Sequence, residues 1–155
     1  MSTRIIGLGQ RFGGDDAAGL AVLDRLKRMP LPEGVTLAEA KDGTALVELL
    51  AGVDRALIVD ALLGPGAPGR IHHLTPTQLG KGQIAAFSTH GLDVGASIAL
   101  AGVLYPETVV REIHIVGIEI ARAERYRQGL SPAVEAAVDE AADMALRFVC
   151  DGADR

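Results

Sequence analysis

The sequence predicts an α/β fold, in which a mostly parallel, twisted sheet of about five strands is the middle layer of a three-layer sandwich between helices. Two observations predict this fold. Short apolar runs alternate with segments whose apolar residues recur at helical spacing, along the whole of the 155 residues. No internal repeat, linker or low-complexity segment interrupts the alternation, so we expect a single domain spanning residues 1–155.

The first expected elements are a strand, a loop and a helix in direct succession. Residues 4–8 form an apolar strand that opens into a glycine-rich loop. Asp15 and Asp16 then begin a helix, because apolar residues recur at helical spacing after them and two prolines after Met29 end the pattern. The loop weakly resembles the glycine-rich fingerprint of dinucleotide-binding proteins. Its glycine spacing does not match that fingerprint, and Glu39 is poorly placed to bind the ribose of a nucleotide. Nucleotide binding is therefore a minor interpretation.

Strands and helices are expected to alternate along the rest of the chain. The strands are expected at 35–38, 55–60, 84–87 and 111–118, and the helices at 44–50, 94–104 and from Pro132 onward. The unbroken apolar run within 55–60 is typical of a parallel strand that helices cover on both faces. Ser131 is expected to cap the last helix, with Pro132 at its first position.

Composition argues against several classes of partner. The chain has a formal net charge of −5, no basic block and no Trp, so we expect no nucleic-acid surface. Cys150 has no second cysteine with which to form a disulfide, and no apolar run approaches the roughly 20 residues of a membrane span. We therefore expect a soluble, cytoplasmic protein that does not insert into a membrane.

Three residues able to bind a metal each follow an apolar run that is expected to be a strand. They are Asp16, Asp60 and His90. Carboxyl ends of parallel strands meet along one edge of a sheet, where open α/β folds collect ligands and catalytic groups. Two carboxylates and one imidazole suit a borderline divalent cation. The sequence therefore predicts one shared metal-binding and catalytic site formed by these three residues.

Each of the three residues also has a simpler explanation when it is taken alone. One acid of the Asp15–Asp16 pair is expected to cap the helix that follows, which contributes about 0.5–2 kcal/mol. Asp60 alone fits a turn cap, and His90 alone fits a histidine held by a neighbouring hydroxyl. These explanations do not account for the shared position of all three residues after strands.

Other polar residues fit a site less well. His72 and His73 are expected in a solvated loop, and His114 is expected to pack within a strand. Glu119 closes the last expected strand and is either a supporting acid beside the site or a surface carboxylate. Cys150 has no obvious base, and the chain has neither a Gly-x-Ser-x-Gly elbow nor a His-Glu-x-x-His helix, which disfavours the usual serine, cysteine and zinc hydrolases.

Several stretches, in the same order from the first strand to the last helix, resemble those of the hydrogenase maturation proteases. They are Gly7–Gly19, Leu57–Ala61 with Pro68–Gly69, Ser88–Gly91, Val116–Glu119 and Leu130–Pro132. The first stretch is fairly specific to the family and the others support it. The sequence departs from the family pattern at Gln10, Ala17 and Ile120, where asparagine, glycine and proline are usual; none of these is a proposed ligand.

The resemblance implies an endopeptidase that removes the C-terminal extension of a nickel–iron hydrogenase large-subunit precursor after nickel insertion. It also implies that Asp16, Asp60 and His90 bind metal, the same residues that the strand ends select. We expect the nickel to come with the precursor and to serve its recognition, although other divalent cations suit the same ligands.

Three other functions are compatible with the sequence. A conventional metallopeptidase would hold its own ion, a nickel-sensing chaperone would bind the precursor without cutting it, and a Rossmann module would bind a nucleotide.

Overall fold

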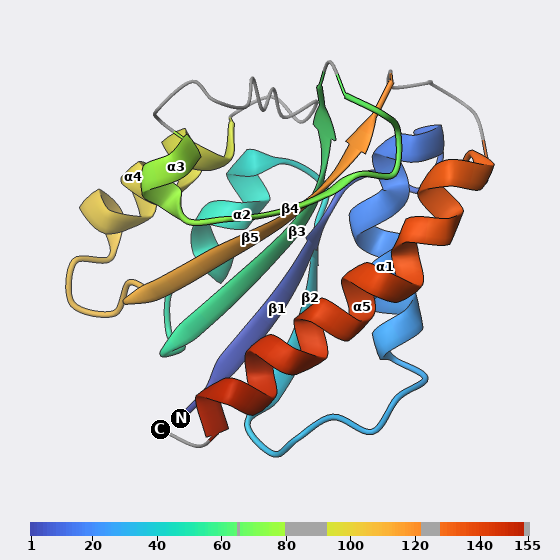
Figure 1. Ribbon diagram of the computed structural model, residues 1–155. Helices are drawn as coiled ribbons and strands as arrows, with labels where there is room; N and C mark the ends of the chain where they lie inside the picture. Colours follow the sequence, from blue (N-terminus) through green and yellow to red (C-terminus); the bar gives the residue numbers. More distant parts are fainter. Residues whose placement is uncertain (65, 80–92, 122–127, 154–155) are drawn as a thin grey trace.

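The computed structural model describes residues 1–64, 66–79, 93–121 and 128–153. Within these ranges five strands form one sheet, with helices on both faces (Figure 1). The strands are β1 (Thr3–Leu8), β2 (Val35–Ala40), β3 (Arg55–Leu63), β4 (Ile71–Leu74) and β5 (Glu112–Ile120). The helices are η1 (Gly14–Ala17), α1 (Ala18–Leu26), α2 (Gly43–Leu49), α3 (Pro76–Leu79), α4 (Val94–Leu104) and α5 (Pro132–Ala153). The predicted three-layer α/β fold is confirmed.

The sheet is mixed, with the order β2-β1-β3-β5-β4. The first four strands in that order run parallel, and β4 pairs antiparallel with β5 at one edge. The expectation that His72 and His73 lie in a loop is therefore wrong, because this short segment gains its hydrogen bonds from a strand more than forty residues away in the chain. The strand predicted at 84–87 lies outside the described residues.

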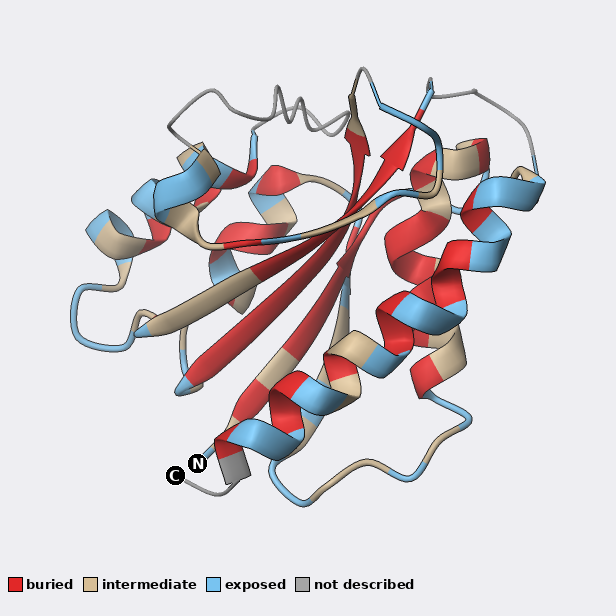
Figure 2. Ribbon diagram, viewed as in Figure 1, coloured by how far each residue is buried: buried red, intermediate tan, exposed pale blue. Residues whose placement is uncertain are grey.

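Side chains alternate between the two faces of the sheet, and each face has its own apolar cluster. Leu57, Val59 and Ala61 of β3 pack with α1 and α5, whereas Ile58 and Leu62 of the same strand pack with α2 and α4. Figure 2 shows the central strands buried and the outer side of α5 exposed. This two-sided burial explains the unbroken apolar run from which β3 was predicted.

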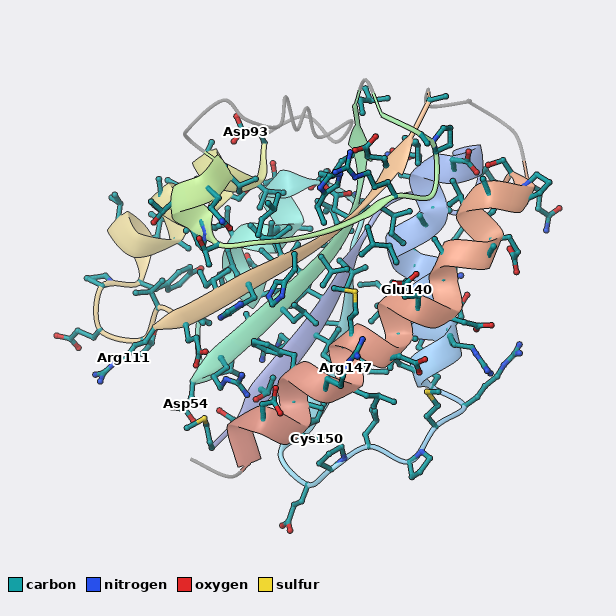
Figure 3. All side chains as sticks on the ribbon, viewed as in Figure 1. Asp54, Asp93, Arg111, Glu140, Arg147 and Cys150 are labelled. Carbon is teal, nitrogen blue, oxygen red and sulfur yellow. The ribbon has the colours of Figure 1, made fainter. Side chains whose placement is uncertain are left out.

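Local capping fixes the helices that cover the second face. The carboxylate of Asp42 accepts a hydrogen bond from the amide of Ala45 at the start of α2, and Asp93 accepts one from Ala96 at the start of α4 (Figure 3). The buried hydroxyl of Ser97 in α4 donates to the carbonyl of Gly43, 2.9 Å away, which joins the two helices. Among the described residues, no helix combines the length and the apolar character that a membrane span requires.

Helix α1 lies unusually close to the sheet because glycines occupy both sides of the contact. A Cβ built on Gly19 would lie 2.3 Å from the carbonyl oxygen of Val59 and 2.7 Å from that of Leu8. A Cβ built on Gly7 of β1 would lie 2.7 Å from the carbonyl oxygen of Gly19. The first turn of α1 therefore rests directly on the backbone of β1 and β3, at the carboxyl end of β1 and beside Val59 of β3.

Candidate active site

Asp60 is buried in β3 at the level of Leu8, the last residue of β1. The paired residues of β1 and β3 end with Gly7 and Val59, one residue before Asp60. The side chain of Asp60 has no exposed surface, and alternation along β3 places it on the face covered by α2 and α4. The prediction that Asp60 ends its own strand is wrong, because β3 continues to Leu63 through its pairing with β5.

Asp16 lies in η1, the short helix that follows the glycine-rich loop, and is 7% exposed. Its backbone amide donates to the carbonyl of Gly13, and its carboxylate lies beside the Cα of Gly13, where a Cβ would approach Oδ2 to 3.3 Å. Gly9 has a φ of 154°, and a Cβ there would lie 2.5 Å from the carbonyl oxygen of Asp16. The glycines of this loop therefore allow η1 to fold back closely on the end of β1.

The structure thus brings two of the three predicted residues to adjoining backbone segments. Asp16 comes just before α1, and the first turn of α1 touches the carbonyl of Val59, the residue before Asp60. The third predicted residue, His90, lies outside the described residues. Among the residues that are described, no group of three or more histidine, cysteine or acidic side chains is arranged to hold a metal ion.

Asp15 has a different role from that of its neighbour. Its Oδ1 accepts a hydrogen bond of 2.6 Å from the amide of Ser131, and its Oδ2 accepts one of 2.7 Å from the Ser131 hydroxyl. Neither η1 nor α1 has a side-chain cap, so the expectation that one acid of the pair caps its own helix is wrong. Asp15 instead ties η1 to the residue before α5, whereas Asp16 is buried in the same short helix.

Glu119 and His72 form a buried pair that the sequence did not predict. The expectation that His72 is solvated is wrong, because its side chain is 12% exposed and its Nε2 is hydrogen bonded to Oε1 of Glu119. Glu119 is 3% exposed, which excludes a surface carboxylate. The segment Ile71–Leu74 has no alternating pattern that could have revealed this, and the shared face of His72 and Leu74 follows only from the pairing of β4 with β5.

The opposite face carries a second polar group of residues. Nε2 of His73 lies 2.8 Å from Nδ1 of His114, whose Nε2 lies 3.3 Å from Glu112. Glu112 also accepts a 3.0 Å hydrogen bond from the buried side chain of Arg55. With Phe148 these residues line a pocket of about 320 Å³ between the sheet and α5.

The environment of this pocket lowers the pKa of His73, first through burial and then through the nearby His114. His73 is therefore kept neutral more readily than an ordinary histidine. His114 packs within β5 as expected, with its ring centroid 4.9 Å from that of Phe148, and both of its ring nitrogens also have polar neighbours.

The charged residues around the glycine-rich loop are paired with one another. Arg11 binds Asp24 at 2.8 Å and also binds Glu39, and Lys27 lies 3.2 Å from Glu39. The Arg11 guanidinium lowers the pKa of Asp24. Glu39 is thus engaged by two cations instead of being presented to a ribose.

Cys150 is exposed on α5, near the C-terminal end of the chain (Figure 3). This end of α5 lies toward the amino ends of the parallel strands (Figure 1).

Comparisons with known proteins give one consistent family. The family model described as hydrogenase maturation protease matches residues 20–148, a span that includes Asp60 and His90 and begins shortly after Asp16. A curated relative, the hydrogenase expression/formation protein HupM of Azotobacter chroococcum, is 28% identical over 153 residues, which cover 95% of this chain and 71% of that protein.

Solved structures share the fold. The [NiFe] hydrogenase maturation protease HybD from Thermococcus kodakarensis matches with a TM-score of 0.73 and 25% identity, covering 96% of this chain and 99% of that one. The hydrogenase maturating endopeptidase HybD from E. coli matches with a TM-score of 0.79 and 21% identity, covering 98% and 94% of the two chains.

Proposed function

Because the chain belongs to the hydrogenase maturation protease family, whose model matches residues 20–148, we propose that it cleaves the large-subunit precursor of a nickel–iron hydrogenase. The cut removes a C-terminal extension after nickel has been inserted. One observation in particular supports this proposal: the fold packs the first turn of α1 onto the strand ends, so that Asp16 and Asp60 lie on adjoining segments at one edge of the sheet.

The residues at this edge fit a nickel ion that the precursor brings with it. Asp16 is 7% exposed and Asp60 is fully buried, and burial of a carboxylate costs much less when a cation is close. Carboxylate oxygens, with the imidazole of His90 as the third ligand, suit a borderline divalent cation. Nickel is here a part of the substrate.

In this proposal the three residues recognise the metal centre of the precursor and hold the scissile peptide in register. A metal held in this way polarises a carbonyl or a bound water. Asp16, Asp60 and His90 would hold that metal, and the proton of the attacking water would need a separate acceptor. Metal-free precursor lacks the recognition element and is left uncut.

The test is intact-mass spectrometry of a large-subunit precursor incubated with the protein, with and without prior nickel loading. Wild type should shorten only the nickel-loaded precursor. Asp16→Asn, Asp60→Asn and His90→Ala should each abolish shortening while retaining the wild-type melting temperature. Asp139→Asn is the matched control, because it removes a carboxylate that is 72% exposed and lies outside the site.

Other results would reject the proposal in distinct ways. Binding of the precursor without any change of mass would indicate a chaperone. Tight nickel binding by the isolated protein in equilibrium dialysis, with cleavage of metal-free precursor, would indicate a metallopeptidase that holds its own ion. Full activity of the three site variants would remove these residues from the mechanism.

A further inference from the structure

The Glu119–His72 pair lies on the same face of the sheet as Asp60 and in line with it. Asp60 of β3 pairs with Gly117 of β5, and Gly117 in turn pairs with His72 of β4. Residues paired in this way point to the same face, and the spacing of adjacent strands puts the Cα atoms of Asp60 and His72 about 10 Å apart. Glu119 lies on this face too, two residues beyond Gly117 in β5.

The carboxylate of Glu119 is enclosed by backbone. Oε1 is bonded to His72, and Oε2 is buried without a hydrogen-bond partner among the residues that the structure describes. A Cβ built on Gly66 would lie 2.4 Å from Oε2, so the chain passes over the carboxylate at a distance that only glycine permits. The amides of Gly69 and Glu119 bond the carbonyls of Glu119 and Arg70, each at 2.8 Å, which fixes the loop over the pair.

A buried carboxylate is costly, and this one is directed at a single imidazole nitrogen. An ionised carboxylate only accepts hydrogen bonds, so in the arrangement that follows the Nε2 of His72 donates to Glu119. In a neutral imidazole bonded in this way, Nδ1 has the lone pair. A carboxylate that fixes the tautomer of a histidine in this manner prepares the other ring nitrogen for proton transfer or ligand binding.

We propose that His72 is the general base and acid of the hydrolysis, and that Glu119 is the residue that positions it. This inference rests on the proposed function. Nδ1 of His72 takes a proton from the attacking water as its oxygen bonds to the scissile carbonyl carbon. Nδ1 then gives that proton to the peptide nitrogen as the carbon–nitrogen bond breaks, so that water is divided between the new carboxyl group and the new amine. The proton exchanged with substrate is the one on Nδ1, while Nε2 stays bonded to Glu119.

A purely structural pair would behave differently on substitution. The side-chain amide of glutamine places its nitrogen near the position of a histidine Nε2. His72→Gln therefore retains a donor for Glu119 and holds β4 against β5, but it has no basic nitrogen. If the pair only held β4 against β5, His72→Gln would leave cleavage unchanged. If His72 transfers a proton, the same substitution abolishes that step.

The experiment combines histidine NMR with steady-state kinetics on the nickel-loaded precursor. In ¹⁵N-labelled protein without substrate, His72 should show a protonated Nε2 and an unprotonated Nδ1. His72→Gln should lower kcat by about 100-fold or more with little change in KM, as expected for loss of a general base. Glu119→Gln should lower kcat and make the His72 tautomer mixed, because an amide can donate to Nε2 as well as accept from it.

The matched control is His73→Gln, which changes the next residue of the same strand on the opposite face and should leave kcat unchanged. Melting temperatures near that of wild type confirm that the variants fold. An Nδ1-protonated His72, or a fully active His72→Gln, overturns the assignment of the base while leaving the proposed protease intact. A wild-type protein that never shortens the loaded precursor overturns the proposed function, and the role of His72 with it.

Discussion

Substitution of Gly19 by alanine tests how the site is assembled. The Cβ of the new alanine would lie 2.3 Å from the carbonyl oxygen of Val59, which is 0.7 Å inside the 3.0 Å limit that real Cβ contacts respect. It would also lie 2.7 Å from the carbonyl oxygen of Leu8 and 3.1 Å from its amide nitrogen. All three atoms belong to paired strands, so no side-chain rotation relieves the contact and α1 has to move away from the sheet.

The expected cost follows from two opposing terms. Overpacking of a well-filled interior costs about 1–3 kcal/mol, and rigid backbone on the other side of the contact places Gly19→Ala near the upper value. Alanine is favoured over glycine in a helix by about 1 kcal/mol, which offsets part of this cost. We therefore expect a net loss of about 2 kcal/mol, or roughly 4–8 °C in melting temperature for a chain of this size.

The assay is urea unfolding and thermal melting of Gly19→Ala beside Gly102→Ala. Gly102 is in the last turn of α4, and a Cβ built there meets nothing within 4 Å. Gly102→Ala should therefore stabilise the protein by up to about 0.5–1 kcal/mol. A Gly19→Ala protein as stable as wild type, or two variants that shift in the same direction, would refute the close packing of α1 on β3. Since Val59 precedes Asp60, Gly19→Ala should also slow processing of the precursor.

Two other predictions concern polar contacts outside the proposed metal site. Asp15→Ala removes both hydrogen bonds to Ser131 and should lower the free energy of unfolding in urea by about 2 kcal/mol, a value typical of hydrogen bonds to a charged group. A loss below about 0.5 kcal/mol would show that the link to α5 is dispensable. Burial and the nearby His114 lower the pKa of His73, so the imidazole of His73 binds a proton more readily in the unfolded chain than in the native protein. The free energy of unfolding should therefore fall as the pH decreases below about 6.5. His73→Gln should flatten that decline in a melting series from pH 7.5 to 5; an unchanged slope relative to wild type would assign the decline to other groups.

Much of the fold could be predicted because its determinants are local. The start and end of α4 were predicted to the residue, since Asp93 caps an apolar segment that Tyr105 ends. The strands β1 and β2 were predicted from short apolar runs, and the predicted start of α5 at Pro132 is confirmed. Each of these elements carries its own boundary residues, so a single pass along the chain finds them.

The site could be predicted only in part, because its remaining members depend on contacts distant in the chain. Asp16 and Asp60 are both buried, and their shared role with His90 stays a prediction. The extension of β3 beyond Asp60 depends on its pairing with β5, and the bond between His72 and Glu119 joins residues 47 positions apart. No local pattern encodes such a partner.

The adjacent histidines of β4 show how strictly the register of the edge strand determines chemistry. His72 points to the face of Asp60 and meets a buried carboxylate, whereas His73 points to the other face and meets His114. In a strand with period two, insertion of one residue in the loop before β4 would exchange these environments. Gly69 has a φ of 91°, and a Cβ built on it would lie only 2.5 Å from the carbonyl oxygen of Ala133, so the path of the chain into β4 requires glycine at this position. The conformation of a surface loop thus decides which of two identical side chains reaches the face of the proposed site, and which one lines the pocket beneath α5.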